Sequence, residues 1–169
     1  MAYVYDGDNL VEETNGAGTA VARFSQGLNI DESLAMLRGG TTSFHQADGL
    51  GSLTSLSNPA GTLANTYTYD SFGNLTASTG SVTNSSRYTG REWDAETSLY
   101  YYRARYYDPQ AGRFIAGDPI GFNGEGPNFY QFVRNNSANL VDPLGLAPCN
   151  SSTLSVGAHI VGDLWYARS

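Results

Sequence analysis

The stretch YTYDSFGNLTAST, residues 67–79, alternates large and polar residues, breaks at a turn, and resumes as a strand-like run. Side chains two residues apart in a strand share a face, so Tyr67 and Tyr69 point the same way. Asp70 and Gly73 are residue types that tight turns favour. The stretch therefore predicts a β-hairpin.

The same order of tyrosine, aspartate, turn and apolar strand occurs three times in the chain. YVYDGDNLVEETN at residues 3–15 matches it closely, and RYYDPQAGRFIAG at residues 105–117 matches it more loosely. Each unit is too small to bury its own apolar face. Internal repetition of this kind favours stacked antiparallel hairpins over a mixed globule.

The composition also favours a mainly β fold. The 169 residues include 20 glycines, 6 prolines, 12 tyrosines and 7 phenylalanines, which favours many short strands joined by turns. This length suits one domain with a real core. No apolar run approaches the roughly 18 residues that span a bilayer, and the N-terminal MAYVYDGDN lacks the basic and apolar regions of a secretion signal. We therefore expect a soluble chain with no membrane span.

The charged residues limit the class of partner. The formal net charge is -7, and phosphate binding needs a basic surface, so we expect no nucleic-acid partner. All nine basic residues are arginine, and five of them lie in one tyrosine-rich stretch: Arg87, Arg91, Arg103, Arg105 and Arg113. Arginine pairs with carboxylates and stacks on aromatic rings, so this stretch can hold buried acidic groups. The alternative is a solvated strand face with arginine over tyrosine.

Two further segments carry weaker patterns. Residues 31–38 fit either a short helix or a strand, and the bounding glycines favour the strand. A short helix is expected near 128–136, where Asn128 can cap its first turn. Three apolar residues would share one face of that helix: Phe129, Phe132 and Val133.

Several long motifs resemble those of a known family. Besides the tyrosine-aspartate repeats they are HQADGLGSL, RYTGREWDAETSLYYYRARYYDPQAGRFIAGDPIGF and NFYQFVRNNSANLVDPLGL. Together they cover residues 3–146 and resemble the C-terminal end of the RHS repeat-associated core domain of bacterial Rhs and toxin-complex proteins. The resemblance implies stacked antiparallel hairpins of the YD type that form part of a curved β-shell around a toxic C-terminal segment.

The resemblance also implies that the core cuts its own chain after a DPxGL motif. Here that motif is DPLGL at residues 142–146, so the cleaved bond would join Leu146 to Ala147. Residues 1–146 would then be the RHS core with an autoproteolytic end. Residues 147–169, whose composition differs from that of the repeats, would be a variable C-terminal tail, far shorter than the toxins of the family.

The family assigns this cleavage to two aspartates and an arginine. The aspartates correspond to Asp118 of DPIGF and Asp142 of DPLGL, and the arginine to Arg105, with Arg113 as the runner-up. The implied partners are the chain's own C-terminal segment, the rest of the shell and, in a full-length parent, a secretion system or an immunity protein. No metal or other cofactor is implied.

The residue types suit this chemistry. In DPIG and DPLG the order Asp, Pro, x, Gly is typical of a type I turn, and the simplest interpretation is that each carboxylate accepts an N–H within its own turn. If the two turns meet, the carboxylates of Asp118 and Asp142 share one proton. One can then activate a water while the other acts as the acid, and a nearby arginine favours the singly charged pair. Sequence does not assign the two roles.

Two expectations remain open. Leu146 is expected to anchor in an apolar pocket lined by Phe122, Phe129 or Phe132. The alternative function is a non-catalytic β-scaffold, whose tyrosine-rich surface packs on neighbouring repeats or binds a cell-surface or carbohydrate partner.

Overall fold

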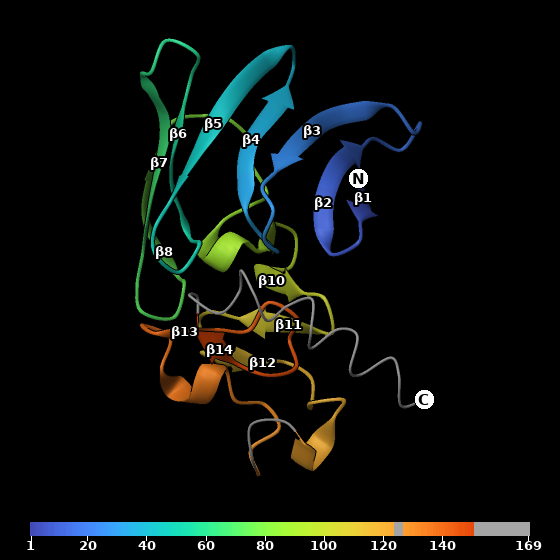
Figure 1. Ribbon diagram of the computed structural model, residues 1–169, viewed down its shortest axis with the longest axis vertical. Coiled ribbons are helices and arrows are strands. Elements are labelled where there is room, and N and C mark those ends of the chain that lie inside the picture. Colours follow the sequence, from blue (N-terminus) through green and yellow to red (C-terminus); the bar gives the residue numbers. More distant parts are fainter. Residues whose placement is uncertain (124–126, 151–169) are drawn as a thin grey trace.

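The computed structural model describes residues 1–123 and 127–150, which form mainly antiparallel β-structure. The first eight strands make one sheet in which each strand pairs with the next along the chain, and Figure 1 shows this sheet curving over the upper part of the molecule. Its strands are β1 (Ala2–Asp6), β2 (Asn9–Thr14), β3 (Ala20–Gln26), β4 (Ser33–Arg38), β5 (Thr41–Ala47), β6 (Leu53–Ser57), β7 (Leu63–Tyr69) and β8 (Leu75–Thr79).

The predicted hairpins are confirmed. Residues 67–79 form the end of β7, the turn and β8, and the Asp70 carboxylate accepts two backbone N–H groups of that turn. Residues 3–15 contain the β1–β2 hairpin. Residues 31–38 contain β4, so the strand interpretation of that segment is also confirmed.

Below the large sheet lie two smaller ones and three 3-10 turns. The four-stranded sheet has the order β12-β11-β10-β9, and its strands are β9 (Glu92–Asp94), β10 (Leu99–Tyr102), β11 (Arg105–Asp108) and β12 (Arg113–Phe114). The two-stranded sheet pairs β13 (Leu140–Val141) with β14 (Cys149–Asn150). The 3-10 turns are η1 (Tyr88–Gly90), η2 (Gly121–Asn123) and η3 (Val133–Asn135).

An aromatic cluster forms the core of the lower part. Strand alternation in β10 and β11 turns one set of rings inward, and five rings have no exposed surface: Tyr100, Tyr102, Tyr107, Phe114 and Phe132. The rings of Tyr107 and Phe132 lie closest, with centroids 4.1 Å apart. Each buried ring removes a large apolar area from water, so this cluster fixes the position of every strand that borders it.

Tyrosine hydroxyl groups join this core to the large sheet. Three of them donate to three consecutive carbonyl groups of the β7–β8 turn. The pairs are Tyr88 to Ser71 (3.1 Å), Tyr107 to Phe72 (2.8 Å) and Tyr100 to Gly73 (3.0 Å). The third copy of the repeat, which is the β11–β12 hairpin, therefore packs against the turn of the second copy.

Residues 128–136 differ from the expected helix. Helical structure there is limited to η3, whose three residues have φ values of 41°, 55° and 57°. Asn128 caps a turn, since its side chain accepts the N–H of Tyr130 at 3.2 Å. The carbonyl group of Tyr130 then accepts the N–H of Phe114 at 2.9 Å, so pairing with β12 takes the backbone group that a helix would need.

No helix within residues 1–123 and 127–150 is long and apolar enough to cross a membrane.

Candidate functional site

The candidate site is centred on Arg105, which begins β11 directly after the tight β10–β11 turn. Its side chain is 1% exposed. The guanidinium carbon lies 3.7 Å from the centroid of the Phe114 ring, within the range of a strong cation–π contact. Nη1 donates to the carbonyl group of Phe129 at 3.0 Å. The charge is therefore buried and held in one orientation.

Two carboxylates meet at one nitrogen of this guanidinium. Nη2 of Arg105 lies 3.1 Å from Oδ2 of Asp118 and 3.5 Å from Oδ2 of Asp142. The side chains of the two aspartates are 4% and 0% exposed. The structure thus brings together Asp118, Asp142 and Arg105, which the sequence analysis grouped, and leaves them hidden from bulk water.

Each carboxylate uses its other oxygen on the backbone. Both DPxG segments close as turns, in which the glycine N–H bonds the aspartate carbonyl group. Oδ1 of Asp118 accepts the N–H of Ile120 at 3.0 Å, within its own turn. Oδ1 of Asp142 reaches further along the chain and accepts the N–H groups of Leu146 at 3.0 Å and Ala147 at 3.1 Å. The nitrogen of the Leu146–Ala147 peptide bond therefore lies against the Asp142 carboxylate.

The β10–β11 turn holds the DPLGL segment from its other side. Three consecutive residues donate to three consecutive carbonyl groups that precede the Leu146–Ala147 bond. The pairs are the Arg103 side chain with Pro143, the Ala104 N–H with Leu144 (3.2 Å), and Nε of Arg105 with Gly145 (2.6 Å). These three hydrogen bonds fix the backbone that precedes the Leu146–Ala147 peptide bond, and Asp142 fixes the N–H groups of Leu146 and Ala147.

Gly145 is required for this fit. Its φ of 67° lies in the left-handed region, which side chains with a Cβ disfavour. A Cβ at this position would overlap the carbonyl oxygen of Tyr102. The DPLGL segment therefore approaches β10 as closely as it does because this residue has no side chain.

The chain on either side of the candidate bond is held as a hairpin. Val141 in β13 pairs with Cys149 in β14, so residues 142–148 form the loop that connects them. Within that loop Leu146 is half-buried and Ala147 is exposed. A cavity of about 490 Å³ reaches the two neighbours of Asp142 in the chain, Val141 and Pro143. Asp142, Leu146 and Ala147 are not among the residues that line this cavity.

The electrostatics distinguish Asp142 from an ordinary aspartate. Burial raises its pKa above 3.8, and the nearby negative charge of Asp118 raises it further. The N–H groups of Leu146 and Ala147 and the charge of Arg105 act in the opposite direction without cancelling the shift. The fold therefore shifts Asp142 towards its protonated form relative to a free aspartate.

Burial, together with the charge of Asp142, also raises the pKa of Cys149. This thiol stays protonated and is a poor nucleophile.

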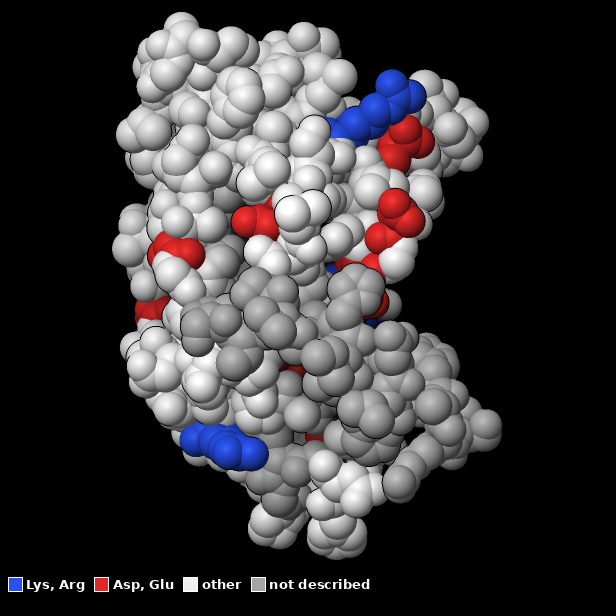
Figure 2. Space-filling model, in the orientation of Figure 1, with Lys and Arg blue, Asp and Glu red and all other residues white. Residues whose placement is uncertain are grey.

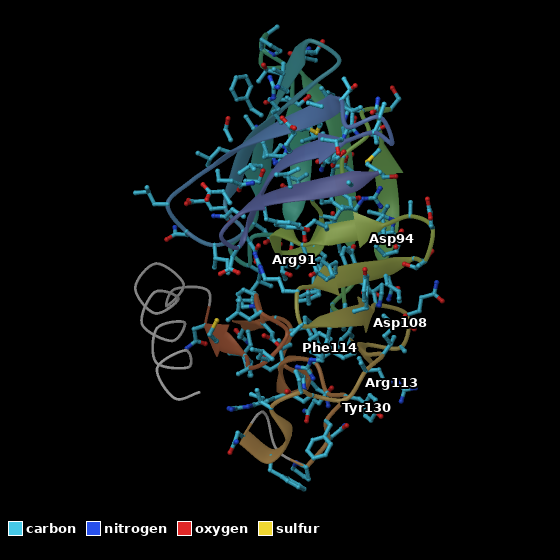
Figure 3. All side chains as sticks on the ribbon, turned by 90° about the vertical axis from the view of Figure 1, so that its right-hand side faces the viewer. Arg91, Asp94, Asp108, Arg113, Phe114 and Tyr130 are labelled. Carbon is cyan, nitrogen blue, oxygen red and sulfur yellow. The ribbon has the colours of Figure 1, made fainter. Side chains whose placement is uncertain are left out.

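Other predicted residues lie elsewhere. Arg113 is exposed in β12, and its partner in the strand register is Asp108 in β11. Figure 3 shows both residues at the outer end of the β11–β12 hairpin, while Phe114 points inward. Phe122 is 81% exposed and packs on Phe129 with ring centroids 4.9 Å apart. Phe132 is part of the closed core, so Phe122 and Phe132, two of the residues expected to line a pocket for Leu146, lie in different surroundings. Residues 151–169 of the predicted tail lie outside the described residues.

The role of the β10–β11 turn is not evident from the sequence. Arg103 is one of the arginines of the tyrosine-rich stretch, and no place beside DPLGL was expected for it. The only available signal is the run RAR, residues 103–105, and nothing in it indicates that its donors meet carbonyl groups forty residues later. Most of these arginines are paired inside the molecule, so the face in Figure 2 shows acidic side chains over its middle and upper parts and basic ones in few places.

The chain resembles parts of much longer proteins. No protein-family model matches it. The tRNA3(Ser)-specific nuclease WapA of Bacillus spizizenii is 34% identical over 151 residues, covering 85% of this chain and 6% of WapA. Double-stranded DNA deaminase toxin A of Burkholderia cenocepacia is also 34% identical over 151 residues, covering 86% of this chain and 10% of the toxin.

A solved structure shares the fold. The crystal structure of TcdB2-TccC3 matches with a TM-score of 0.63 and 25% identity, over 79% of this chain and 7% of that one. The chain thus spans a tenth or less of the length of WapA, of deaminase toxin A and of the TcdB2-TccC3 chain. These similarities, with the tyrosine-aspartate hairpins and the paired DPxG turns, show that the chain belongs to the RHS-type toxin shell family.

Proposed function

We propose that this chain is the self-cleaving end of a toxin shell, which hydrolyses its own peptide bond between Leu146 and Ala147 and frees the segment that follows. One observation carries the proposal: Asp118 and Asp142 converge on one nitrogen of Arg105, with the N–H of Ala147 on the Asp142 carboxylate. Two buried carboxylates and one guanidinium leave one net negative charge. A proton on one carboxylate neutralises the group, which the raised pKa of Asp142 favours.

We assign different roles to the two carboxylates. Asp118 lies nearer to Arg105, at 3.1 Å, and we assign it the role of the base. Asp142, with its raised pKa and its contact to the Ala147 nitrogen, suits the acid. Asp118 takes a proton from a water as the water oxygen adds to the Leu146 carbonyl carbon. Asp142 then gives its proton to the Ala147 nitrogen as the C–N bond breaks.

This sequence balances as a single turnover. It consumes one water, leaves a carboxylic acid at Leu146 and an amine at Ala147, and moves one proton from Asp142 to Asp118. No cofactor is required, and the groups need not be reset. Covalent tethering compensates for modest chemistry, because intramolecular reactions gain effective molarities of about 10⁵ M or more when the geometry is right.

The relatives support a role in processing a C-terminal toxin whose activity differs from one protein to another. The two relatives named above act, by their names, on tRNA and on double-stranded DNA, yet both match about the same share of this chain at 34% identity. A region shared by a nuclease and a deaminase does not carry either activity. We therefore assign this region to the shell and its processing, and the toxic chemistry to whatever follows the cut.

Matched aspartate variants of the 169-residue chain test the proposal. The variants are Asp118→Asn, Asp142→Asn and, as a control, Asp108→Asn. Asp108 also accepts backbone N–H groups of its own turn, at 2.9 and 3.1 Å, so in all three variants the amide oxygen of asparagine can still accept the backbone N–H groups that the aspartate accepted. Only the first two changes remove a carboxylate that faces Arg105. We expect them to slow cleavage by a factor of about 10² or more, and Asp108→Asn to cleave like the parent.

The readout is the intact mass of each purified protein over time. Loss of the tail in the parent and in Asp108→Asn, with retention in the other two variants, supports the proposal. Equal cleavage in all four proteins, or a cut at another bond, contradicts it. If the parent protein is not cleaved, the alternative function, a non-catalytic β-scaffold, is the one that remains.

A further inference from the structure

Arg103 connects three parts of the molecule that are far apart in sequence. From the β10–β11 turn its guanidinium donates to the carbonyl group of Pro143 and to that of Asp8 in the β1–β2 turn. It also bonds both carboxylate oxygens of Asp31, at 2.6 and 3.1 Å. The side chain is 13% exposed. One planar fork thus joins the first hairpin, the β3–β4 loop and the DPLGL turn.

Asp31 is itself held in place by two other groups. Its N–H donates to the side chain of Asn9 in β2 at 3.0 Å. Its carboxylate also bonds Nη1 of Arg91 at 2.5 Å, and the Arg91 side chain has no exposed surface. Figure 3 shows Arg91 at the junction of the large sheet with the lower part of the molecule. The anchor for Arg103 therefore exists only when the large sheet is folded against the small one.

The backbone of this clamp is strained. Arg103 and Asp31 have φ values of 55° and 62°, which cost non-glycine residues about 1 kcal/mol or more each. Such conformations persist where surrounding contacts impose them. The two-residue β10–β11 turn places Arg103 where hairpin turns take positive φ, and the bonds between Arg103 and Asp31 and from Arg103 to Pro143 hold the side chain there.

We propose that Arg103 is a positioning residue for self-cleavage, which couples the folded β1–β4 hairpins to the alignment of Asp142. This inference rests on the proposed function. Pro143 directly follows Asp142, so the bond from Arg103 fixes the backbone that carries the acid. A displacement of about 1 Å can cost a reaction of this kind a factor of about 10². Cleavage is thereby restricted to molecules in which the sheet has already folded.

The first test compares two half-buried arginines of the chain. Arg103→Gln removes the clamp, whereas Arg38→Gln removes a similar ion pair, between β4 and Glu13 of β2. We expect the first change to slow cleavage about tenfold to a hundredfold and the second to leave the rate near that of the parent, at matched folded fractions from urea unfolding. Arg103→Lys keeps a charge and one donor for Pro143, so it should recover part of the rate.

The second test does not depend on cleavage. In the Asp118→Asn background, hydrogen exchange is measured at the amides of Leu146 and Ala147, which both bond Asp142. Arg103→Gln should speed exchange at these amides about tenfold, and Arg38→Gln should not. A change that merely loosened the whole fold would speed exchange equally in both variants.

The outcomes separate the two proposals. If the parent is never cut but Arg103→Gln speeds hydrogen exchange at the amides of Leu146 and Ala147, the proposed function is wrong and the coupling is supported. If the parent is cut and Arg103→Gln matches Arg38→Gln in rate and in exchange, the coupling is wrong and self-cleavage stands. If Arg103→Gln does not fold, Arg103→Lys provides the same comparison.

Discussion

At the scale of single residues, Gly145 determines whether the DPLGL segment can lie against β10. Gly145→Ala places a Cβ on the Tyr102 carbonyl group and adds left-handed strain, so we expect it to block cleavage and to lower the free energy of unfolding by about 2–4 kcal/mol. Gly39→Ala is the control, because Gly39 has a similar φ of 59° with open space around it. It should cost about 1 kcal/mol and leave cleavage intact. Urea unfolding and intact mass measure the two effects, and normal processing of Gly145→Ala would contradict this account.

The protonation of Asp142 determines how the rate of cleavage should change with pH. Its pKa in the fold is raised, mainly by burial, so the carboxyl group keeps its proton above the pH at which a free aspartate loses it. The proposed step needs that proton. Cleavage should therefore slow as pH rises through the raised pKa, by about tenfold per pH unit beyond it. Rates from intact mass between about pH 4 and 9, with folding checked at each pH, test this dependence. A rate that climbs across that range would exclude Asp142 as the acid.

Part of the site could be predicted from individual residues. The DPxG turns and the buried arginines follow from local chemistry, because aspartate before proline begins turns and a guanidinium accompanies buried carboxylates. Which arginine lies beside the aspartates depends on strand register. Arg105 pairs with Tyr102 and faces the core, whereas Arg113 faces solvent at the edge. The bond from Arg103 to Pro143 depends on contacts across the fold, which no local pattern encodes.

At the scale of elements, tyrosine hydroxyl groups dock the β7–β8 turn onto the small sheet. Tyr107→Phe leaves the carbonyl group of Phe72 without this partner, so the free energy of unfolding should fall by about 1–3 kcal/mol. Tyr106→Phe is the control, because Tyr106 is 40% exposed on the other face of the same strand, and its change should stay within about 0.5 kcal/mol. Urea unfolding compares the two. Equal losses would mean that the hydroxyl bond contributes nothing to docking.

Strands were easier to predict than the segment near 128–136. Alternating tyrosines on either side of an aspartate turn specify a hairpin locally. Residues 128–136 have apolar spacing typical of a helix, yet their backbone groups bond β12, the Asp118 turn and Arg105 instead. Tertiary partners for the carbonyl groups outweigh a weak helical preference. The sequence offers no sign of those partners.

At the scale of the whole molecule, the large sheet has two free edges within the described chain. β1 and β8 each pair with one neighbour, and every residue of β8 is exposed. Unpaired edges of this kind are templates for further strands. This chain spans a tenth or less of WapA, of deaminase toxin A and of the TcdB2-TccC3 chain, and a longer shell would supply such strands.

The most direct test of the central claim is a time course of intact mass during refolding of the full 169-residue chain from urea. The account predicts that the parent mass converts, at a first-order rate independent of protein concentration, into two fragments that end at Leu146 and begin at Ala147. Independence of concentration follows because the reacting groups and the bond belong to one chain. A parent mass that stays constant in the folded protein, or a rate that increases with concentration, would contradict self-cleavage by Asp118 and Asp142.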